Sequence, residues 1–190
     1  MNGLFAAAEQ VQRLCEAEGW SFCFIGGLAV QRWGEARVTR DVDLTLLTGF
    51  GDEEAFVTRL VAAFSSRVPD PEALARRARV VLLRTASGIP VDVALGALPF
   101  EERSVVRSST WVVPGTEPLR TCSAEDLLVH KVFAGRDRDW SDVGGIVARH
   151  GTGLDLNQVT EELQPLLEVK GTTSDLARFG RVVEELRAPD

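Results

Sequence analysis

Two aspartates, Asp41 and Asp43, are the residues of this chain whose types and spacing point most directly to chemistry. Residues 41–47 alternate polar and apolar side chains, which is the period of a β-strand, so both carboxylates should point to the same face. Carboxylates held this close repel each other and stay ionised together only when a cation lies between them. The pair therefore indicates a divalent metal site, although a solvated edge strand explains an isolated Asp-x-Asp about equally well.

A glycine pair, Gly26-Gly27, precedes these aspartates and follows the short apolar run 22–25. Residues 28–33 then have a helical composition, so we expect a strand, a glycine turn and a short helix. Such a turn exposes backbone N–H groups at a helix N-terminus, where a phosphate can bind without help from a side chain. A Gly-Gly pair alone is usually just a tight turn, but its position ahead of Asp41 and Asp43 strengthens both signals.

The order Ile25-Gly26-Gly27, then Asp41-Val42-Asp43-Leu44, resembles the signature of the DNA polymerase β-like nucleotidyltransferase superfamily. The resemblance implies that Asp41, Asp43 and a third carboxylate on a neighbouring strand hold two Mg²⁺ ions, with Mn²⁺ as a substitute. Asp92 is the candidate third ligand, because Val91 and Val93 should face the core and Asp92 the opposite side. In the implied chemistry Asp41 and Asp43 bridge the ions, while Asp92 binds the ion that carries the attacking oxygen and accepts its proton.

Later runs narrow the resemblance to the AbiEii/AbiGii toxin family. The matching segments are Arg37-Val38-Thr39-Arg40-Asp41-Val42-Asp43, residues 123–131 and residues 136–143. By position, Lys131 would act in catalysis and hold the nucleotide phosphates, and Asp139 and Asp142 would form the later acidic motif. The nucleotide-binding residues implied in this way are Gly26, Gly27, Arg37, Thr39, Arg40, Lys131, Asp139 and Asp142. Leu28 stands where the family often has a serine, which removes one hydroxyl ligand for a phosphate.

The elements that must position these residues follow from periodicity. Residues 4–18 predict a helix with one buried face, and Asp52 is the expected N-cap of a helix over 53–65. Residues 79–85 and 91–95 predict an antiparallel hairpin. From Ser123 onward four helical patterns follow one another. We therefore expect an α+β fold, with a nucleotidyltransferase core over 1–122 and a helical region over 123–190 that completes the active-site cleft.

Composition limits the remaining interpretations. The 190 residues carry 21 Lys+Arg against 28 Asp+Glu, a net charge of −7, so the whole molecule does not attract polyanions and must bind them locally or through metal ions. The three cysteines have no metal-ligand spacing and predict reduced core thiols, hence a cytoplasmic protein. No apolar run approaches membrane-spanning length, so no membrane partner is expected.

The function that these observations predict is Mg²⁺-dependent transfer of an NMP from an NTP, ATP among them, to a hydroxyl. The resemblance implies an RNA, tRNA or protein acceptor in a toxin–antitoxin or phage-defence setting, with a cognate antitoxin as a partner. Adenylylation of a cationic antibiotic, an aminoglycoside or a lincosamide, is the second enzymatic interpretation, and the net negative charge suits it mildly. The third is an inactive fold that only binds a nucleotide or a partner, against which the presence of all three carboxylates argues.

Overall fold

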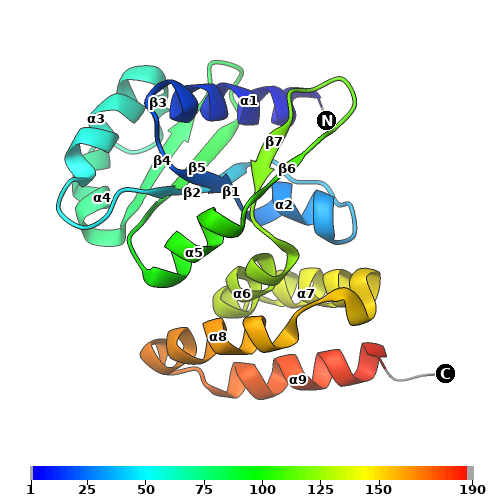
Figure 1. Ribbon diagram of the computed structural model, residues 1–190. Coiled ribbons are helices and arrows are strands. Elements are labelled where there is room, and N and C mark those ends of the chain that lie inside the picture. Colours follow the sequence, from blue (N-terminus) through cyan, green and yellow to red (C-terminus); the bar gives the residue numbers. More distant parts are fainter. Residues whose placement is uncertain (1, 188–190) are drawn as a thin grey trace. The chain divides into compact units, whose positions relative to one another are not determined.

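The computed structural model describes residues 2–187, and in this part of the chain a seven-stranded mixed sheet organises the first of two units (Figure 1). That unit comprises Met1–Leu28 and Val38–Cys122, and the second comprises Ala29–Arg37 and Ser123–Asp190. The α+β class predicted from the sequence is confirmed. Residues 29–37, which precede the aspartate pair in sequence, group with the helical unit.

The sheet places the aspartate strand near its centre. Its order is β3-β4-β5-β2-β1-β7-β6, with β2 parallel to β5 and antiparallel to β1. The hairpin expected from residues 79–95 forms as the antiparallel pair β4–β5. The strands are β1 (Phe22–Phe24), β2 (Val42–Leu47), β3 (Ser65–Ser66), β4 (Val80–Arg84), β5 (Pro90–Gly96), β6 (Ser109–Trp111) and β7 (Leu119–Thr121).

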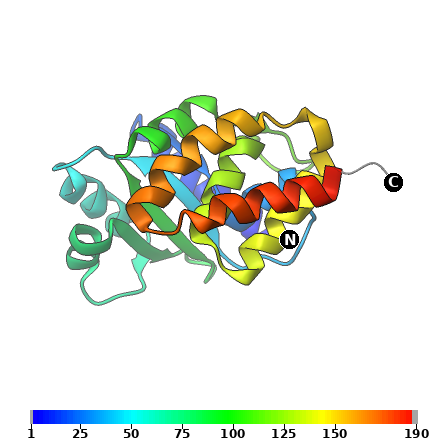
Figure 2. The ribbon, with the colours of Figure 1, turned by 90° about the horizontal axis from the view of Figure 1, so that it is seen from below.

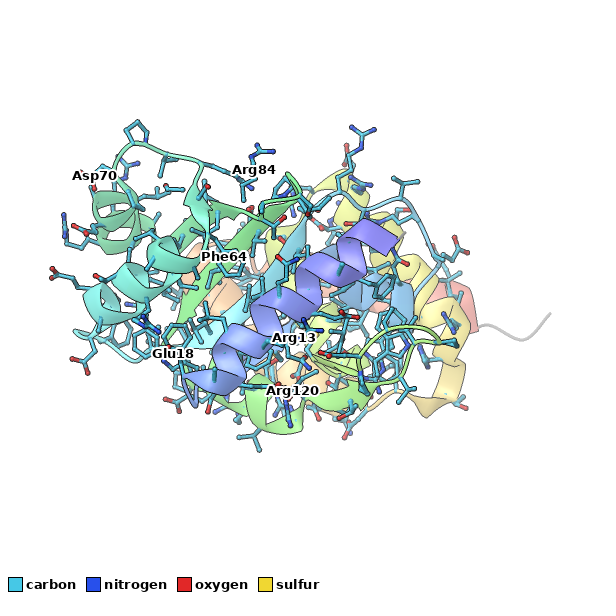
Figure 3. All side chains as sticks on the ribbon, turned by 90° about the horizontal axis from the view of Figure 1, so that it is seen from above. Arg13, Glu18, Phe64, Asp70, Arg84 and Arg120 are labelled. Carbon is cyan, nitrogen blue, oxygen red and sulfur yellow. The ribbon has the colours of Figure 1, made fainter. Side chains whose placement is uncertain are left out.

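Helix α1 (Asn2–Ala17) covers one face of this sheet (Figure 3). Its buried stripe, which includes Ala7 and Val11, belongs to the same apolar core as Val42, Leu44 and Leu46 of β2. Each fully buried side chain of this size contributes about 1.5–3 kcal/mol relative to exposure. Because Val42, Leu44 and Leu46 of β2 face this core, the alternation of the strand directs Asp43 to the opposite face. On the outer side of α1, Arg13 binds Glu117 through two nitrogens, at 2.7 and 3.0 Å.

Three further helices belong to the first unit: α3 (Glu53–Ala63), α4 (Pro71–Ala78) and α5 (Pro99–Arg107). Strand β3 and helix α4 were not expected from the sequence. Asp70 caps α4 by accepting a hydrogen bond from the Ala73 N–H at 2.8 Å, and Pro71 occupies the first turn. Asp52 occupies the N-cap position of α3, as predicted, but its side chain makes no capping hydrogen bond, and the helix ends at Ala63 rather than at 65.

The second unit is built from four consecutive helices, α6 (Ala124–Ala134), α7 (Asp137–His150), α8 (Leu156–Lys170) and α9 (Ser174–Arg187), with a short 3₁₀ turn at Gly151–Gly153. Helices α8 and α9 lie side by side (Figure 2). Helix α7 begins at Asp137, where Asp139 accepts the Arg136 backbone N–H and closes the first turn. The last residues of α2 (Gly26–Trp33) also belong here: the Trp33 carbonyl bonds to His150 at 2.8 Å and the Gly34 carbonyl to Arg149 at 2.7 Å.

All three cysteines are buried and, within residues 2–187, none forms a disulfide, as predicted. Burial raises the pKa of the Cys15 thiol to about 12, so this sulfur stays protonated and unreactive at neutral pH. Over residues 2–187, no helix combines the length and the hydrophobicity needed to cross a bilayer.

Candidate active site

Two of the three predicted metal ligands lie side by side in the sheet. The parallel register of β2 and β5 pairs Asp43 with Asp92 directly. Residues that face each other across neighbouring strands point to the same side of a sheet, with their backbones about 4.8 Å apart. Asp41 lies two residues before Asp43, at the residue that leads into β2. All three aspartates are partly exposed, so solvent and ligands can reach them.

The glycine pair makes room for the aspartate strand. Gly26 begins α2 with a φ of +59°, and a Cβ there would lie 2.0 Å from Asp43 Oδ2. A Cβ on Gly27 would lie 2.2 Å from Thr39 Oγ1. Gly27 also donates its backbone N–H to Asp43 Oδ2 at 3.4 Å. In this structure, therefore, the pair permits a close approach of Asp43 and Thr39 to the start of α2, in addition to exposing backbone N–H groups.

Thr39 and Arg40 lie in the segment that leads to the aspartates. The Thr39 hydroxyl donates to Asp41 Oδ1 at 3.1 Å, which orients that carboxylate. Thr39 is thus held between Gly27 on one side and Asp41 on the other. The neighbouring Arg40 is exposed, which leaves its guanidinium accessible to an anion.

The carboxylate of Asp92 has a cationic neighbour that sequence reasoning missed. Arg67 Nη1 donates to Asp92 Oδ1 at 2.7 Å, and both side chains are partly exposed. Arg67 follows the two-residue strand β3, in a stretch without strand periodicity. No spacing rule connects it with Asp92, so only the sheet topology could have revealed the pair.

The donor set suits a hard divalent cation, because all three predicted ligands are carboxylates. Within residues 2–187, no three His, Cys, Asp or Glu side chains are gathered as a ready-made metal site. The Asp92 carboxylate is instead paired with Arg67. The backbone register pairs Asp43 with Asp92, and the donor set is one that Mg²⁺ prefers, so their role as metal ligands stays a prediction.

The predicted residues of the helical unit form a separate ion network. Lys131 on α6 is 7% exposed at its side chain and binds Asp142 at 2.8 Å and Asp139 at 3.1 Å. Arg37 binds both carboxylate oxygens of Asp142, at 2.7 and 2.8 Å. Arg136 binds Asp139 at 2.6 Å. The Lys131 ammonium is therefore shared between two buried carboxylates, and its role as a phosphate ligand stays a prediction.

The charges of this network set the pKa values of its acids. Burial by itself raises the pKa of Asp142, but hydrogen bonds and charge from Arg37 and Lys131 outweigh burial and lower the pKa. Asp139 shows the same balance: burial raises its pKa, and Arg136 with Lys131 lowers it overall. Both acids are therefore ionised at neutral pH, and each compensates a cation that is buried or half-buried.

The predicted residues thus fall into two groups, and the residues of each group belong to one unit. The group on the sheet unit contains Gly26, Gly27, Thr39, Arg40, Asp41, Asp43 and Asp92. The group on the helical unit contains Arg37, Lys131, Asp139 and Asp142. The first has the donors for a metal and a phosphate. The second is a buried network of alternating charge.

Solved structures of low sequence identity share the fold of this chain. Among them are an antigenic nucleotidyltransferase-like protein from Paracoccidioides brasiliensis and the antibiotic-resistance factor ANT(2'')-Ia. The first is 15% identical with a TM-score of 0.52, over 93% of this chain and 91% of that one. The second is 12% identical with a TM-score of 0.58, over 92% and 96%. No curated protein matches the chain.

The family described as the nucleotidyl transferase AbiEii toxin of type IV toxin–antitoxin systems matches residues 12–190. That span contains both groups of predicted site residues, the whole second unit and all of the first unit except its first 11 residues. The chain therefore belongs to the AbiEii toxin family of nucleotidyltransferases.

Proposed function

We propose that the protein transfers an NMP from an NTP to a hydroxyl group and releases pyrophosphate, with Mg²⁺ held by Asp41, Asp43 and Asp92. The observation that carries the proposal is the strand register, which pairs Asp43 of β2 with Asp92 of β5. A structural core has no need for two carboxylates in adjacent positions, because their mutual repulsion destabilises the sheet. A polyphosphate site that uses metal ions does need them, since the ions neutralise developing charge and lower the pKa of the attacking hydroxyl.

The residues around this pair have roles that follow from their positions. Asp92 accepts the proton of the acceptor hydroxyl, and Thr39 keeps the Asp41 carboxylate oriented through its 3.1 Å hydrogen bond. Arg40 offers an exposed positive charge to the nucleotide next to Asp41. The backbone at Gly26 and Gly27 contributes the positive end of α2, which favours a phosphate.

Lys131 supports the reaction in one of two ways. As a phosphate ligand it would exchange one of its carboxylate partners for the nucleotide, as the family resemblance implies. In the arrangement seen here it serves as the internal counterion of Asp139 and Asp142. Lys131→Arg, which keeps the charge, separates the two roles when nucleotide affinity and thermal stability are measured together.

For the acceptor we propose RNA, tRNA included, or a protein hydroxyl, with a cognate antitoxin as the partner and the cytoplasm as the location. The type IV toxin–antitoxin description of the family supports this setting. Because the chain carries a net charge of −7, a polyanionic acceptor must be held by local basic residues and by metal ions.

Antibiotic adenylylation is the second candidate, and the net charge of −7 favours it because an acidic protein attracts a polycationic drug. Expression in bacteria separates the two candidates. A toxin slows growth without changing drug sensitivity, whereas a resistance enzyme raises the inhibitory concentration of an aminoglycoside or a lincosamide without slowing growth.

The decisive experiment incubates the purified protein with each α-labelled NTP, Mg²⁺ and either total cellular RNA or lysate protein. We expect one NTP to label one class of acceptor. Asp41→Asn combined with Asp43→Asn should abolish labelling, and Asp52→Asn is the matched control because Asp52 is exposed and makes no side-chain cap bond. Labelling that survives in the double variant refutes the metal assignment. Nucleotide binding without labelling of any acceptor favours an inactive binding module.

A further inference from the structure

The ion pair between Arg67 and Asp92 joins a cation of the sheet unit to a predicted metal ligand. Arg67 Nη1 lies 2.7 Å from Asp92 Oδ1, and the side chains of Arg67 and Asp92 are 23% and 32% exposed. A pair this accessible to solvent contributes little to stability. Its position beside the carboxylates therefore calls for another explanation than folding.

The sheet register explains how Arg67 reaches Asp92 from two strands away. The Arg67 backbone N–H donates to the Leu82 carbonyl at 2.8 Å, which extends the β3–β4 ladder by one residue. Leu82 pairs with Asp92, and Asp92 pairs with Asp43. Arg67, Leu82, Asp92 and Asp43 thus form one row across four neighbouring strands, on the same side of the sheet. The Arg67 guanidinium therefore reaches Asp92 from the β3 side of this row.

The Arg67 guanidinium and a divalent ion would both interact with the acids of this row. Asp43 and Asp92 are adjacent acids, and in the metal-free protein the Arg67 guanidinium reduces their repulsion. A divalent ion that binds Asp92 must take over the carboxylate that Arg67 holds, and it also feels the repulsion of the Arg67 charge. Arg67 is therefore useful to the metal-free state and unfavourable to the loaded one.

We propose that Arg67 competes with the divalent cation for Asp92 and so sets the metal affinity of the site. The proposal rests on the proposed function, because it takes Asp92 as a metal ligand. It makes Arg67 a positioning residue: the guanidinium holds the third carboxylate until the ion arrives. The site is then filled only at a cation concentration that overcomes this competition, or together with a nucleotide whose negative charge offsets Arg67.

The test measures Mn²⁺ affinity without nucleotide, by the electron paramagnetic resonance signal of free Mn²⁺, with Mg²⁺ added as a competitor. Arg67→Gln should bind Mn²⁺ about three- to tenfold more tightly than the unmodified protein, because the competing charge is gone. Arg67→Lys keeps the charge and should stay within about twofold of the unmodified protein. Arg76→Gln is the matched control, because it removes an exposed positive charge from α4 of the same unit.

A thermal melt adds a readout that a purely structural role would not produce. Without metal, Arg67→Gln should melt slightly lower than the unmodified protein, since Asp92 loses the cation with which it is paired. Saturating Mn²⁺ should raise its melting temperature by more than it raises that of the unmodified protein, because tighter binding stabilises more.

Asp92→Asn separates failure of this inference from failure of the proposed function. If Asp92→Asn weakens Mn²⁺ binding while Arg67→Gln leaves it unchanged or weaker, the competition is refuted and the metal site stands. If each of the single variants Asp41→Asn, Asp43→Asn and Asp92→Asn leaves the Mn²⁺ affinity unchanged, the metal site itself is refuted. Support requires tighter binding in Arg67→Gln that disappears in the double variant with Asp92→Asn, where position 92 no longer offers the carboxylate for which Arg67 and the ion compete.

Discussion

Replacing Gly26 by alanine is the sharpest perturbation of the site that the structure offers. The new Cβ would lie 2.0 Å from Asp43 Oδ2, 2.5 Å from Asp43 Cγ and 2.7 Å from Asp43 Cβ. A carbon and an oxygen that are not bonded need more than 3 Å between them, so the carboxylate has to move by roughly 1 Å or more. The residue also keeps a φ of +59°, which costs a non-glycine residue about 1–2 kcal/mol.

The expected result combines a moderate loss of stability with a large loss of activity. The left-handed backbone and the repacking of one side chain together destabilise the unit by about 2–4 kcal/mol. Displacing a catalytic group by about 1 Å costs on the order of 100-fold in rate. We therefore expect Gly26→Ala to remain folded while NMP transfer falls about 100-fold and Mn²⁺ affinity falls with it.

Gly19→Ala is the matched control for this variant. Gly19 belongs to the same unit and has a φ of +68°, but a Cβ there would meet no atom within 4 Å. It therefore carries the backbone cost without the collision, and it should melt a few degrees lower with unchanged Mn²⁺ affinity and transfer. If Gly26→Ala matched Gly19→Ala in both metal affinity and transfer, the assignment of Gly26 as the residue that makes room for Asp43 would be refuted.

The remaining predictions concern charge and metal. Asp142→Asn should destabilise the protein to thermal or urea unfolding by about 3 kcal/mol, because Arg37 and the buried Lys131 each lose a carboxylate, whereas exposed Asp137→Asn on the same helix should change stability by less than about 1 kcal/mol. Because the pKa values of Asp139 and Asp142 are lowered in the folded state, their stabilisation is present above the ordinary aspartate pKa and lost below about pH 4; a urea midpoint that stays constant down to pH 3 would contradict this. Burial, together with the charge of Lys131, lowers the pKa of His130 to about 4 against the opposing charge of Asp126, so stability should fall by up to about 3 kcal/mol between pH 6.5 and 4, and His130→Gln should remove that part of the pH dependence. Chelation with EDTA should abolish NMP transfer, and added Mg²⁺ or Mn²⁺ should restore it; transfer that continues in EDTA would show that no metal is needed.

Periodicity found the elements that carry the strongest local patterns. The alternation of residues 41–47 predicted strand β2, and the apolar stripe of residues 4–18 predicted α1, because each is buried on one face. Strand β3 could not be found in this way, since Ser65–Ser66 is short and polar and pairs only because β4 lies beside it. Helix α4 could have been predicted from the sequence, because Asp70-Pro71-Glu72 is a typical helix start.

The site shows the same division between local and long-range information. The Asp41–Asp43 pair and the glycine pair were visible as motifs, but the collision distances at Gly26 and Gly27 require coordinates. The partner of Asp92 was invisible, because Arg67 lies 25 residues away and reaches it through a row of paired strands. Resemblance identified Lys131, but it did not indicate that the ammonium is shared between two buried carboxylates.

The Arg-x-Thr-x-Asp-x-Asp run reads as one motif, yet its residues belong to two local structures. Arg37 is held by Asp142 in the helical unit, whereas Thr39 contacts Gly27 and orients Asp41 in the sheet unit. The unit boundary falls between Arg37 and Val38, so the segment just before the predicted metal ligands is also where the chain passes from one unit to the other. A substitution at Asp142 therefore acts first on the stability of the helical network, and one at Gly27 acts first on the orientation of Asp41. The conformation of this short motif therefore depends on residues of both units, because Arg37 is bound by Asp142 and Thr39 by Asp41.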